Sequence, residues 1–412
     1  MTCVAPSTPV TNQHDLKEVL KQTQGVPFYQ RPEWAQALAL PHPVLANLPH
    51  LTKEDFRQNS PTGFLPDRFD LATLAQSGII EEESTSGTSG TSVRVIFGST
   101  WWAEQEARAL RQNRLIRQVL QENPLARRAV FTTPGCSGVS CYARWLNYDQ
   151  RILGQTLFVN QSRIPFTIPE EKYAQMAEET LRWNPAFLDV DPVHGMAFAL
   201  YCERHQIRFP DLRFILTSYE YTSVVHRRIM NRVFGVPIIN LYGSSETGHL
   251  LIEKEDGYLV PSEETALLEI DSPQASRIGQ LLVTTLTNPY LPLIRYEIGD
   301  YVEKQSRGYQ VHGRMRDALL DQYGMIVTTR QIDELFSDLE KVAHYQLRQN
   351  SAGDCELFLL PEKSEDPLTE TIAVIAERLK KRLGFAINSQ SVSLITPEDS
   401  GKFRLTARFV QK

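Results

Sequence analysis

The sequence is short of several features that define whole classes of protein. Its 412 residues include only five cysteines, and such an odd, scattered set argues against a disulfide framework and favours a reducing compartment. It has no excess of positive charge, because 43 Lys and Arg stand against 49 Asp and Glu, a net charge of −6. Non-specific binding to nucleic acid or to a membrane surface needs a basic face, so we expect neither partner.

Long apolar runs are also missing. No stretch approaches the roughly 18 to 20 apolar residues of a membrane-spanning helix, and the first residues, Met1 to Pro9, lack the basic and apolar segments of a secretory signal. The hydrophobic fraction of 42% is nevertheless enough for buried cores, which excludes wholesale disorder. These observations predict a cytoplasmic globular protein of two or three domains, and at this length an enzyme is the commonest kind.

Strand and helix patterns alternate through the middle of the chain. Short apolar runs bounded by turn residues predict strands, and longer runs with a 3.6-residue period predict helices. Alternation of this kind is typical of an α/β fold with mixed or largely parallel sheets flanked by helices. The predicted strands are 129–133, 213–217, 236–242 and 280–286, and the predicted helices are 101–122, 170–183, 193–205 and 223–234.

The pattern changes after Gly313. Two predicted strands, 344–348 and 355–360, surround a turn and precede an amphipathic helix. We therefore predict a large N-terminal domain over residues 1–313 and a small α+β domain over residues 314–412.

A loop of small hydroxyl residues and glycines lies just before a β-branched run, Val93 to Phe97. Glycines let a backbone approach a polyanion, and hydroxyl and amide groups donate hydrogen bonds to phosphate oxygens. A flexible linker has a similar composition, but the strand pattern after the loop favours a phosphate-binding loop between two strands. It is not a Walker loop, because no Gly-Lys-Ser/Thr follows. The loop residues are Thr85, Ser86, Gly87, Thr88, Ser89 and Gly90.

A second motif, Tyr242-Gly243-Ser244-Ser245-Glu246, ends a predicted buried strand. Ligands bind at the ends of strands in open α/β sheets. Glu246 is suited to Mg²⁺ because hard cations prefer carboxylate oxygens, and the ring of Tyr242 is suited to stacking on a base. The alternative is an ordinary turn with a solvated glutamate.

Three further motifs are individually modest. Asp300 follows a glycine at a predicted strand end, where it would either bind ribose hydroxyls or cap the turn. The segment Arg314 to Asp317 lies at the predicted domain boundary, where it would be either a hinge that also takes part in the chemistry or a charged hinge with no chemical role. Lys402 belongs to a Ser-Gly-Lys-Phe-Arg segment, which in isolation would be a solvated basic tail.

In order and spacing, these motifs resemble the adenylate-forming superfamily of acyl-CoA synthetases, luciferases and peptide-synthetase adenylation domains. The series is Thr-Ser-Gly-Thr-Ser-Gly, Tyr-Gly-Ser-Ser-Glu, Arg-Tyr-x-x-Gly-Asp, Gly-Arg-x-x-Asp and Gly-Lys-x-Arg. The segments 48–57 and 283–296 look like the phenylacetate–CoA ligase branch of that superfamily. The resemblance extends from near Leu45 to the end of the chain.

The resemblance implies two half-reactions that use ATP and Mg²⁺. A carboxylate first attacks the α-phosphate, which gives an acyl-adenylate and pyrophosphate, and a thiol, by family default that of coenzyme A, then displaces AMP. By this resemblance, residues 85–90 would bind the phosphates, Glu246 would coordinate Mg²⁺, and Ser245 would support phosphate or acyl oxygens. Tyr242 and Gly243 would line the adenine and acyl side, and Asp300 with Arg314 would bind the ribose. Lys402, carried on a mobile C-terminal domain, would stabilise charge.

The acid and the acceptor stay open at this point. The branch favours an aromatic or aryl-alkyl acid, with an acyl pocket near Gly135, Tyr219 and Glu220, although simple packing explains these residues equally well. A carrier-protein phosphopantetheine arm, an enzyme cysteine or an amine are alternative acceptors. A non-catalytic homologue that serves as a binding protein is a different class of function, and either a monomer or a homodimer is expected.

The chain departs from the family pattern in two places. The phosphate loop lacks its usual lysine, for which Arg94 is a candidate substitute, and the hinge position holds Arg316 in place of the commoner Asp or Lys. Some relatives hold zinc through cysteines near the hinge. No cysteine occurs between Cys202 and Cys355, so no structural zinc is predicted.

Overall fold

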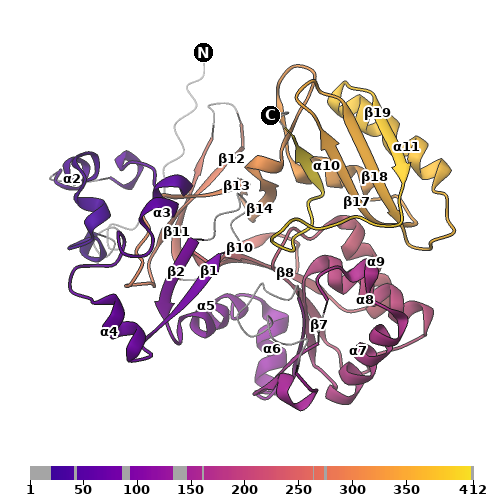
Figure 1. Ribbon diagram of the computed structural model, residues 1–412, viewed down its shortest axis with the longest axis horizontal. Helices are drawn as coiled ribbons and strands as arrows, with labels where there is room; N and C mark the ends of the chain where they lie inside the picture. The colour runs from indigo at the N-terminus through magenta and orange to yellow at the C-terminus, as the bar shows by residue number, and fades with distance from the viewer. Residues whose placement is uncertain are drawn as a thin grey trace.

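One mixed sheet of twelve strands organises most of the molecule in the computed structural model (Figure 1). The structure describes residues 20–40, 44–85, 93–132, 146–159, 162–262, 264–272 and 276–409. The strand order is β11-β12-β13-β14-β10-β9-β8-β7-β6-β3-β5-β4. The strands are β3 Arg128–Phe131, β4 Ile152–Leu153, β5 Thr156–Phe158, β6 Phe187–Val190, β7 Phe214–Thr217, β8 Ile238–Ser244, β9 Gly248–Glu253, β10 Leu259–Pro261, β11 Ala266–Asp271, β12 Ile278–Thr285, β13 Tyr296–Gln305 and β14 Gly308–Arg314.

The sheet changes character at β8. The strands from β5 through β3, β6 and β7 to β8 run parallel, whereas every pair from β8 to β11 is antiparallel. The predicted α/β class is confirmed, but a largely parallel sheet is wrong for the second half. The described residues between these strands form no crossover helix, and short connections join β8 to β9, β9 to β10, β11 to β12 and β13 to β14, which are antiparallel neighbours. The pair of β10 and β14 instead brings together strands that are distant in the sequence.

Helices cover both faces of the parallel half. Leu188 and Ile215 pack with α7, α8 and α9, while their neighbours Phe187 and Phe214 pack with α5 and α6. Successive side chains of a strand point to opposite faces, so strands covered on both sides carry apolar residues at every position. The helices are α5 Trp101–Leu110, α6 Arg114–Glu122, α7 Glu170–Trp183, α8 Pro192–Arg204 and α9 Val224–Phe234.

The single helix predicted over residues 101–122 is wrong, because α5 and α6 are separate. Asn113 begins α6: its side chain accepts a hydrogen bond from the Ile116 amide at 3.1 Å and donates to the Glu253 carbonyl at 2.8 Å. Asparagine is a favoured helix cap because its side chain satisfies an amide that lacks a partner within the helix.

Short N-terminal elements pack on the antiparallel half, in a second buried cluster that includes Trp34, Phe56 and Tyr296. The hairpin of β1 and β2 flanks the predicted phosphate loop. Thr85 ends β1, while Ser86 to Gly90 lie outside the described residues. The elements are η1 Pro27–Gln30, α2 Pro32–Leu38, η2 Leu45–Asn47, α3 Lys53–Asn59, α4 Leu71–Gln76, β1 Ile80–Thr85 and β2 Val93–Gly98.

Residues 314–409, which we call the C-terminal segment, form a second sheet of four strands in the order β19-β18-β17-β20 (Figure 1). The two strands and the amphipathic helix predicted there are confirmed as β17, β18 and α11. One buried hydrophobic cluster joins this segment to α8 and α9, which cover the large sheet. A functional site can therefore contain residues from both parts of the chain. The elements are β15 Leu319–Leu320, β16 Ile326–Val327, α10 Thr329–Asp333, β17 Val342–Gln349, β18 Cys355–Pro361, α11 Thr369–Leu383, β19 Ile387–Ser391 and β20 Thr406–Arg408.

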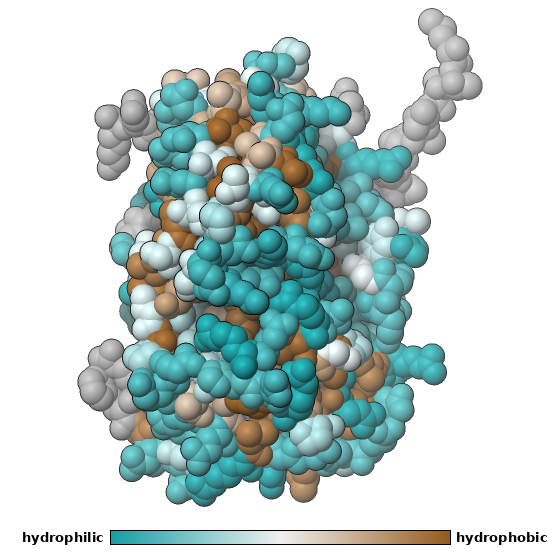
Figure 2. Space-filling model, turned by 90° about the vertical axis from the view of Figure 1, so that its right-hand side faces the viewer, coloured by the Kyte–Doolittle hydropathy of each residue, from teal (hydrophilic) through white to brown (hydrophobic). Residues whose placement is uncertain are grey.

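Hydrophilic side chains predominate across the middle of the face in Figure 2, with apolar patches scattered above and below. Among the helices that the structure describes, none is both long and apolar enough to cross a membrane.

Candidate active site

The turn after β8 stands where the parallel half of the sheet meets the antiparallel half. Ser244 Oγ and Thr247 Oγ1 lie 3.0 Å apart and tie the turn together. A Cβ atom at Gly243 would overlap the carbonyl oxygen of Gly248 on the adjacent strand, so only glycine fits there. This close approach places Ser245 and Glu246 beyond the end of the strand.

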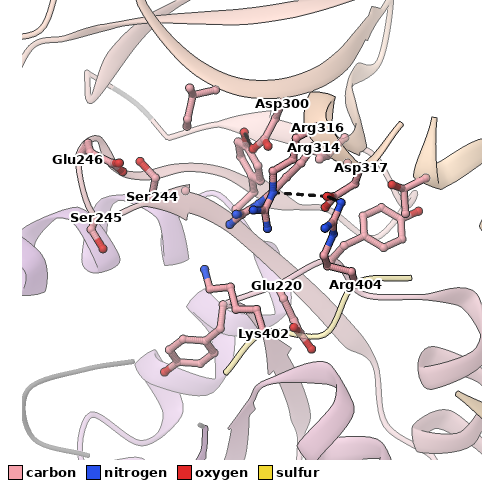
Figure 3. A pocket seen from close by; sticks show the side chains of 18 of the residues that line it. Glu220, Ser244, Ser245, Glu246, Asp300, Arg314, Arg316, Asp317, Lys402 and Arg404 are labelled. Atoms are coloured by element: carbon pink, nitrogen blue, oxygen red, sulfur yellow. Dashed lines mark hydrogen bonds and ion pairs between the residues drawn. The ribbon is translucent and has the colours of Figure 1, made fainter. Parts of the chain in front are cut away.

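A cavity of about 270 Å³ lies beside this turn (Figure 3). It joins residues of the large sheet to the C-terminal segment, from which Lys402 extends into the space. Gly135 and residues 86–90 lie outside the described residues. The predicted site residues that line it are Tyr219, Glu220, Tyr242, Gly243, Ser245, Glu246, Asp300, Arg314 and Lys402.

Tyr242 and Asp300 form the most direct contact between two of the predicted motifs. The Tyr242 hydroxyl donates to Asp300 Oδ2 at 2.7 Å. Burial and the adjacent carboxylate raise the pKa of Tyr242 well above its usual value, so the phenol stays a neutral donor. Arg314 pairs in register with Asp300 across β13 and β14. The carboxylate therefore has a fixed orientation and keeps its second oxygen for another hydroxyl.

Lys53 is a site residue that the sequence prediction missed. It is the first residue of α3, which begins with a Thr52–Asp55 capping box, and it lines the cavity. Desolvation lowers the pKa of Lys53, and the nearby carboxylates Glu246 and Asp300 oppose that shift. A Cβ at Gly299 would lie 2.9 Å from Lys53 Nζ, so the glycine leaves room for the ammonium group.

Arg94, the candidate substitute for the missing loop lysine, is paired with another residue. Its guanidinium forms an exposed ion pair with Glu82 on the neighbouring strand of the β1–β2 hairpin. Arg94 is absent from the lining of the cavity, whereas Lys53 belongs to it. Lys53 is therefore one of the cations that line the cavity, and one that the sequence prediction did not include.

Glu246 is the residue that the sequence predicts to hold Mg²⁺. It lines the cavity, and the Tyr296 hydroxyl lies 3.4 Å from its Oε1 atom. Within the described ranges, no three His, Cys, Asp or Glu side chains cluster so as to hold a metal ion. A single carboxylate suits Mg²⁺ bound jointly with nucleotide phosphates and water, because this ion rarely occupies an all-protein cage.

A tight turn of the C-terminal segment presents Lys402. The Gly401 amide donates to the Glu398 carbonyl at 2.8 Å, and the Glu398 amide donates to the Lys402 carbonyl at 2.9 Å. The Glu398 carboxylate accepts from Arg316 at 2.6 Å and from Arg404 at 3.4 Å. The unusual arginine at the predicted hinge thus contacts the turn that carries the lysine.

Tyr219 and Glu220, predicted at an acyl pocket, lie beside the same turn. Tyr219 has a φ of 75°, which is rare for a bulky residue and marks a position held by its surroundings. Glu220 Oε2 accepts a hydrogen bond from the Phe403 amide at 2.7 Å. Glu220 therefore contacts the C-terminal segment, a connection between residues far apart in the sequence.

Comparisons with known proteins show which sequences and folds this chain is similar to. No family model matches the chain. Phenylacetate-coenzyme A ligase of Escherichia coli (strain K12) is 26% identical over 391 residues, which cover 86% of this chain and 82% of that protein. The Pseudomonas putida phenylacetate-coenzyme A ligase is 25% identical over 385 residues, which cover 85% of this chain and 81% of that protein.

Solved structures share the fold at lower identity. 2-Hydroxyisobutyryl-CoA ligase, in its postadenylation state in complex with 2-HIB-AMP, has a TM-score of 0.70 at 16% identity and covers 99% of this chain and 94% of its own. The same ligase with 2-HIB-AMP and CoA in the thioesterification state, at the same coverage, has a TM-score of 0.55.

The chain belongs to the adenylate-forming superfamily. Within that superfamily it is acyl-CoA ligase-like and a distant relative of phenylacetate–coenzyme A ligase.

Proposed function

We propose that this protein is an AMP-forming acid–thiol ligase. It would activate a carboxylic acid with ATP, release pyrophosphate, and transfer the acyl group from acyl-AMP to the thiol of coenzyme A. The observation that carries this proposal is the convergence of Glu246, Asp300 and Lys402 on one cavity. The names of the two curated relatives support an aromatic or aryl-alkyl acid as the substrate class.

The charges around the cavity suit the first half-reaction. Negative charge accumulates at the α-phosphorus as the carboxylate attacks, and fixed cations stabilise such a transition state. Lys402 and Lys53 supply these cations, while Glu246 would hold Mg²⁺ against the phosphate oxygens. Asp300, oriented by Tyr242, would accept hydrogen bonds from the ribose hydroxyls. Mg²⁺ would neutralise phosphate charge at this site.

The second half-reaction needs a different arrangement of the C-terminal segment. Lys402 lines the cavity in the present arrangement, where it would meet the reacting carboxylate, and a thiol needs its own path to the acyl carbon. We therefore propose that residues 314–412 form a mobile domain that rotates about Arg314 to Asp317. The higher TM-score against the postadenylation state than against the thioesterification state of the same ligase supports two such arrangements.

The structure bears on one alternative acceptor. Burial raises the pKa of Cys202 to about 12 and that of Cys355 to about 11. A thiol of this kind is a poor nucleophile near neutral pH, because the thiolate is the reactive form. Neither of the cysteines that the structure describes therefore suits the role of an acyl acceptor.

A panel of carboxylic acids in an ATP–pyrophosphate exchange assay tests the proposal, with coenzyme A added to the best acid. Exchange with an arylacetic or aromatic acid and formation of its acyl-CoA are the expected results. AMP release without an acyl-CoA would favour a carrier protein or an amine as acceptor. No exchange with any acid would favour a binding protein that lacks catalysis.

A further inference from the structure

Glu220 makes two contacts that differ in kind. Its Oε2 atom accepts the Phe403 amide hydrogen at 2.7 Å, directly beside Lys402 in the chain. Its Oε1 atom is out of reach of solvent and faces the side chain of Asp191. Among the residues that the structure describes, neither Glu220 Oε1 nor Asp191 Oδ2 has another hydrogen-bond partner. Two buried carboxyl groups in contact share a proton, because like charges repel strongly there.

The surroundings decide which of the two carboxyl groups carries that proton. Asp191 is the N-cap of α8, and its Oδ1 atom accepts from the amides of Val193 at 3.0 Å and His194 at 3.4 Å. Amide donors and the helix dipole stabilise a carboxylate at this position. Asp191 is therefore the ionised member, and Glu220 is the neutral one. Glu220 then donates from Oε1 to Asp191 while its carbonyl oxygen Oε2 accepts from Phe403.

We propose that Glu220 is a positioning residue of the first half-reaction: in its protonated form it joins Asp191 to the backbone beside Lys402, and so holds that lysine in the cavity. This inference rests on the proposed function for its catalytic consequence. The contacts of Glu220 with Asp191 and with the Phe403 amide belong to the folded chain and do not depend on that function.

The link depends on pH in a defined direction. Burial first, and then the charge of Asp191, raise the pKa of Glu220 well above its usual value while the C-terminal segment is in place; the Phe403 amide and Lys402 oppose the shift. Burial lowers the pKa of His194 on the Asp191 side, so that ring is neutral. Once the segment leaves, the Glu220 pKa returns towards its ordinary value. The stabilisation is therefore complete below that ordinary value and is lost as the pH rises through the raised one.

Glutamine is a matched mimic of the protonated side chain. In Glu220→Gln, the amide nitrogen donates to Asp191 and the amide oxygen accepts from Phe403, at any pH. Glu220→Ala removes both contacts. The three proteins therefore separate the hydrogen bonds from the proton that permits them.

Hydrogen–deuterium exchange of segment 399–405 in the full-length protein without ligand tests the link directly, between about pH 6 and pH 9. We expect segment 399–405 to stay protected in Glu220→Gln and to exchange on the order of tenfold faster in Glu220→Ala. The wild type should match Glu220→Gln at low pH and approach Glu220→Ala as the pH rises. A constant ratio between wild type and Glu220→Gln would overturn the proton dependence. Equal protection in Glu220→Ala and Glu220→Gln would overturn the link.

Activity then tests the catalytic consequence. Pyrophosphate exchange should fall at alkaline pH in the wild type but not in Glu220→Gln, while thioester formation from preformed acyl-adenylate should be alike in all three proteins. Equal loss of both half-reactions in Glu220→Ala would contradict a positioning role. Absence of pyrophosphate exchange in the wild type would refute the proposed function. The hydrogen–deuterium exchange of segment 399–405 would still show whether Glu220 joins Asp191 to the backbone beside Lys402.

Discussion

Replacing Lys53 by methionine should slow the first half-reaction and leave the fold intact. Lys53 lines the cavity near Glu246 and Asp300, where it would meet phosphate oxygens of ATP. A hydrogen bond to a charged group contributes about 1.5 to 3 kcal/mol, which corresponds to a loss of about ten- to one hundred-fold in kcat/KM for ATP. Desolvation already disfavours the ammonium group, so the melting temperature of Lys53→Met should not fall.

The assay is pyrophosphate exchange at saturating acid with varied ATP, and Arg94→Ala is the matched control. Arg94 forms only the exposed pair with Glu82, and exposed pairs contribute little. Lys53→Arg should restore part of the rate, because it restores the charge with a different shape. An unchanged kcat/KM in Lys53→Met, or an equal loss in Arg94→Ala, would refute this assignment of the phosphate-binding cation.

Two further predictions concern buried hydrogen bonds. Tyr242→Phe removes the donor to Asp300 and should raise the KM for ATP by about tenfold, from the roughly 1 to 3 kcal/mol that an unsatisfied buried group costs; an unchanged KM would show that Asp300 needs no orientation. Asp333 accepts from Ser223 Oγ at 2.5 Å and from the Val224 amide at 2.9 Å, and burial raises its pKa to about 6. A carboxyl group whose pKa is raised in the folded state contributes stability that is present at low pH and lost as the pH rises to about 6. The melting temperature of the wild type should therefore decline over that range, and that of Asp333→Asn should not. Parallel curves of melting temperature against pH for the two proteins would contradict this prediction.

The sequence pointed to the motifs that line the cavity better than to the residues around them. Glu246, Asp300 and Lys402 could be found because each follows a recognisable turn at the end of a strand or near the end of the chain. Their meeting in one cavity depends on the C-terminal segment, whose position no local pattern encodes. Lys53 escaped notice because a lysine in the first turn of a short helix is ordinarily a solvated side chain.

Two other residues make tertiary contacts that no local pattern indicated. Arg94 was suggested for the phosphates from its place after the loop, but it pairs with Glu82 across the hairpin and is not among the residues that line the cavity. Glu220 was predicted at an acyl pocket, and it lines the cavity; it also accepts a hydrogen bond from Phe403, which lies 183 residues further along the chain. Contacts over such a separation arise from packing, which sequence periodicity does not report.

The central proposal is that Lys402 acts in acid activation and leaves the cavity for acyl transfer. It is tested most directly by measuring both half-reactions of Lys402→Ala, with ATP–pyrophosphate exchange for the first and thioester formation from preformed acyl-adenylate for the second. Exchange should be lost, because the cation that stabilises charge at the α-phosphate is gone, while thioester formation should stay close to that of the wild type. Equal loss of both, or exchange at the wild-type rate, would contradict it.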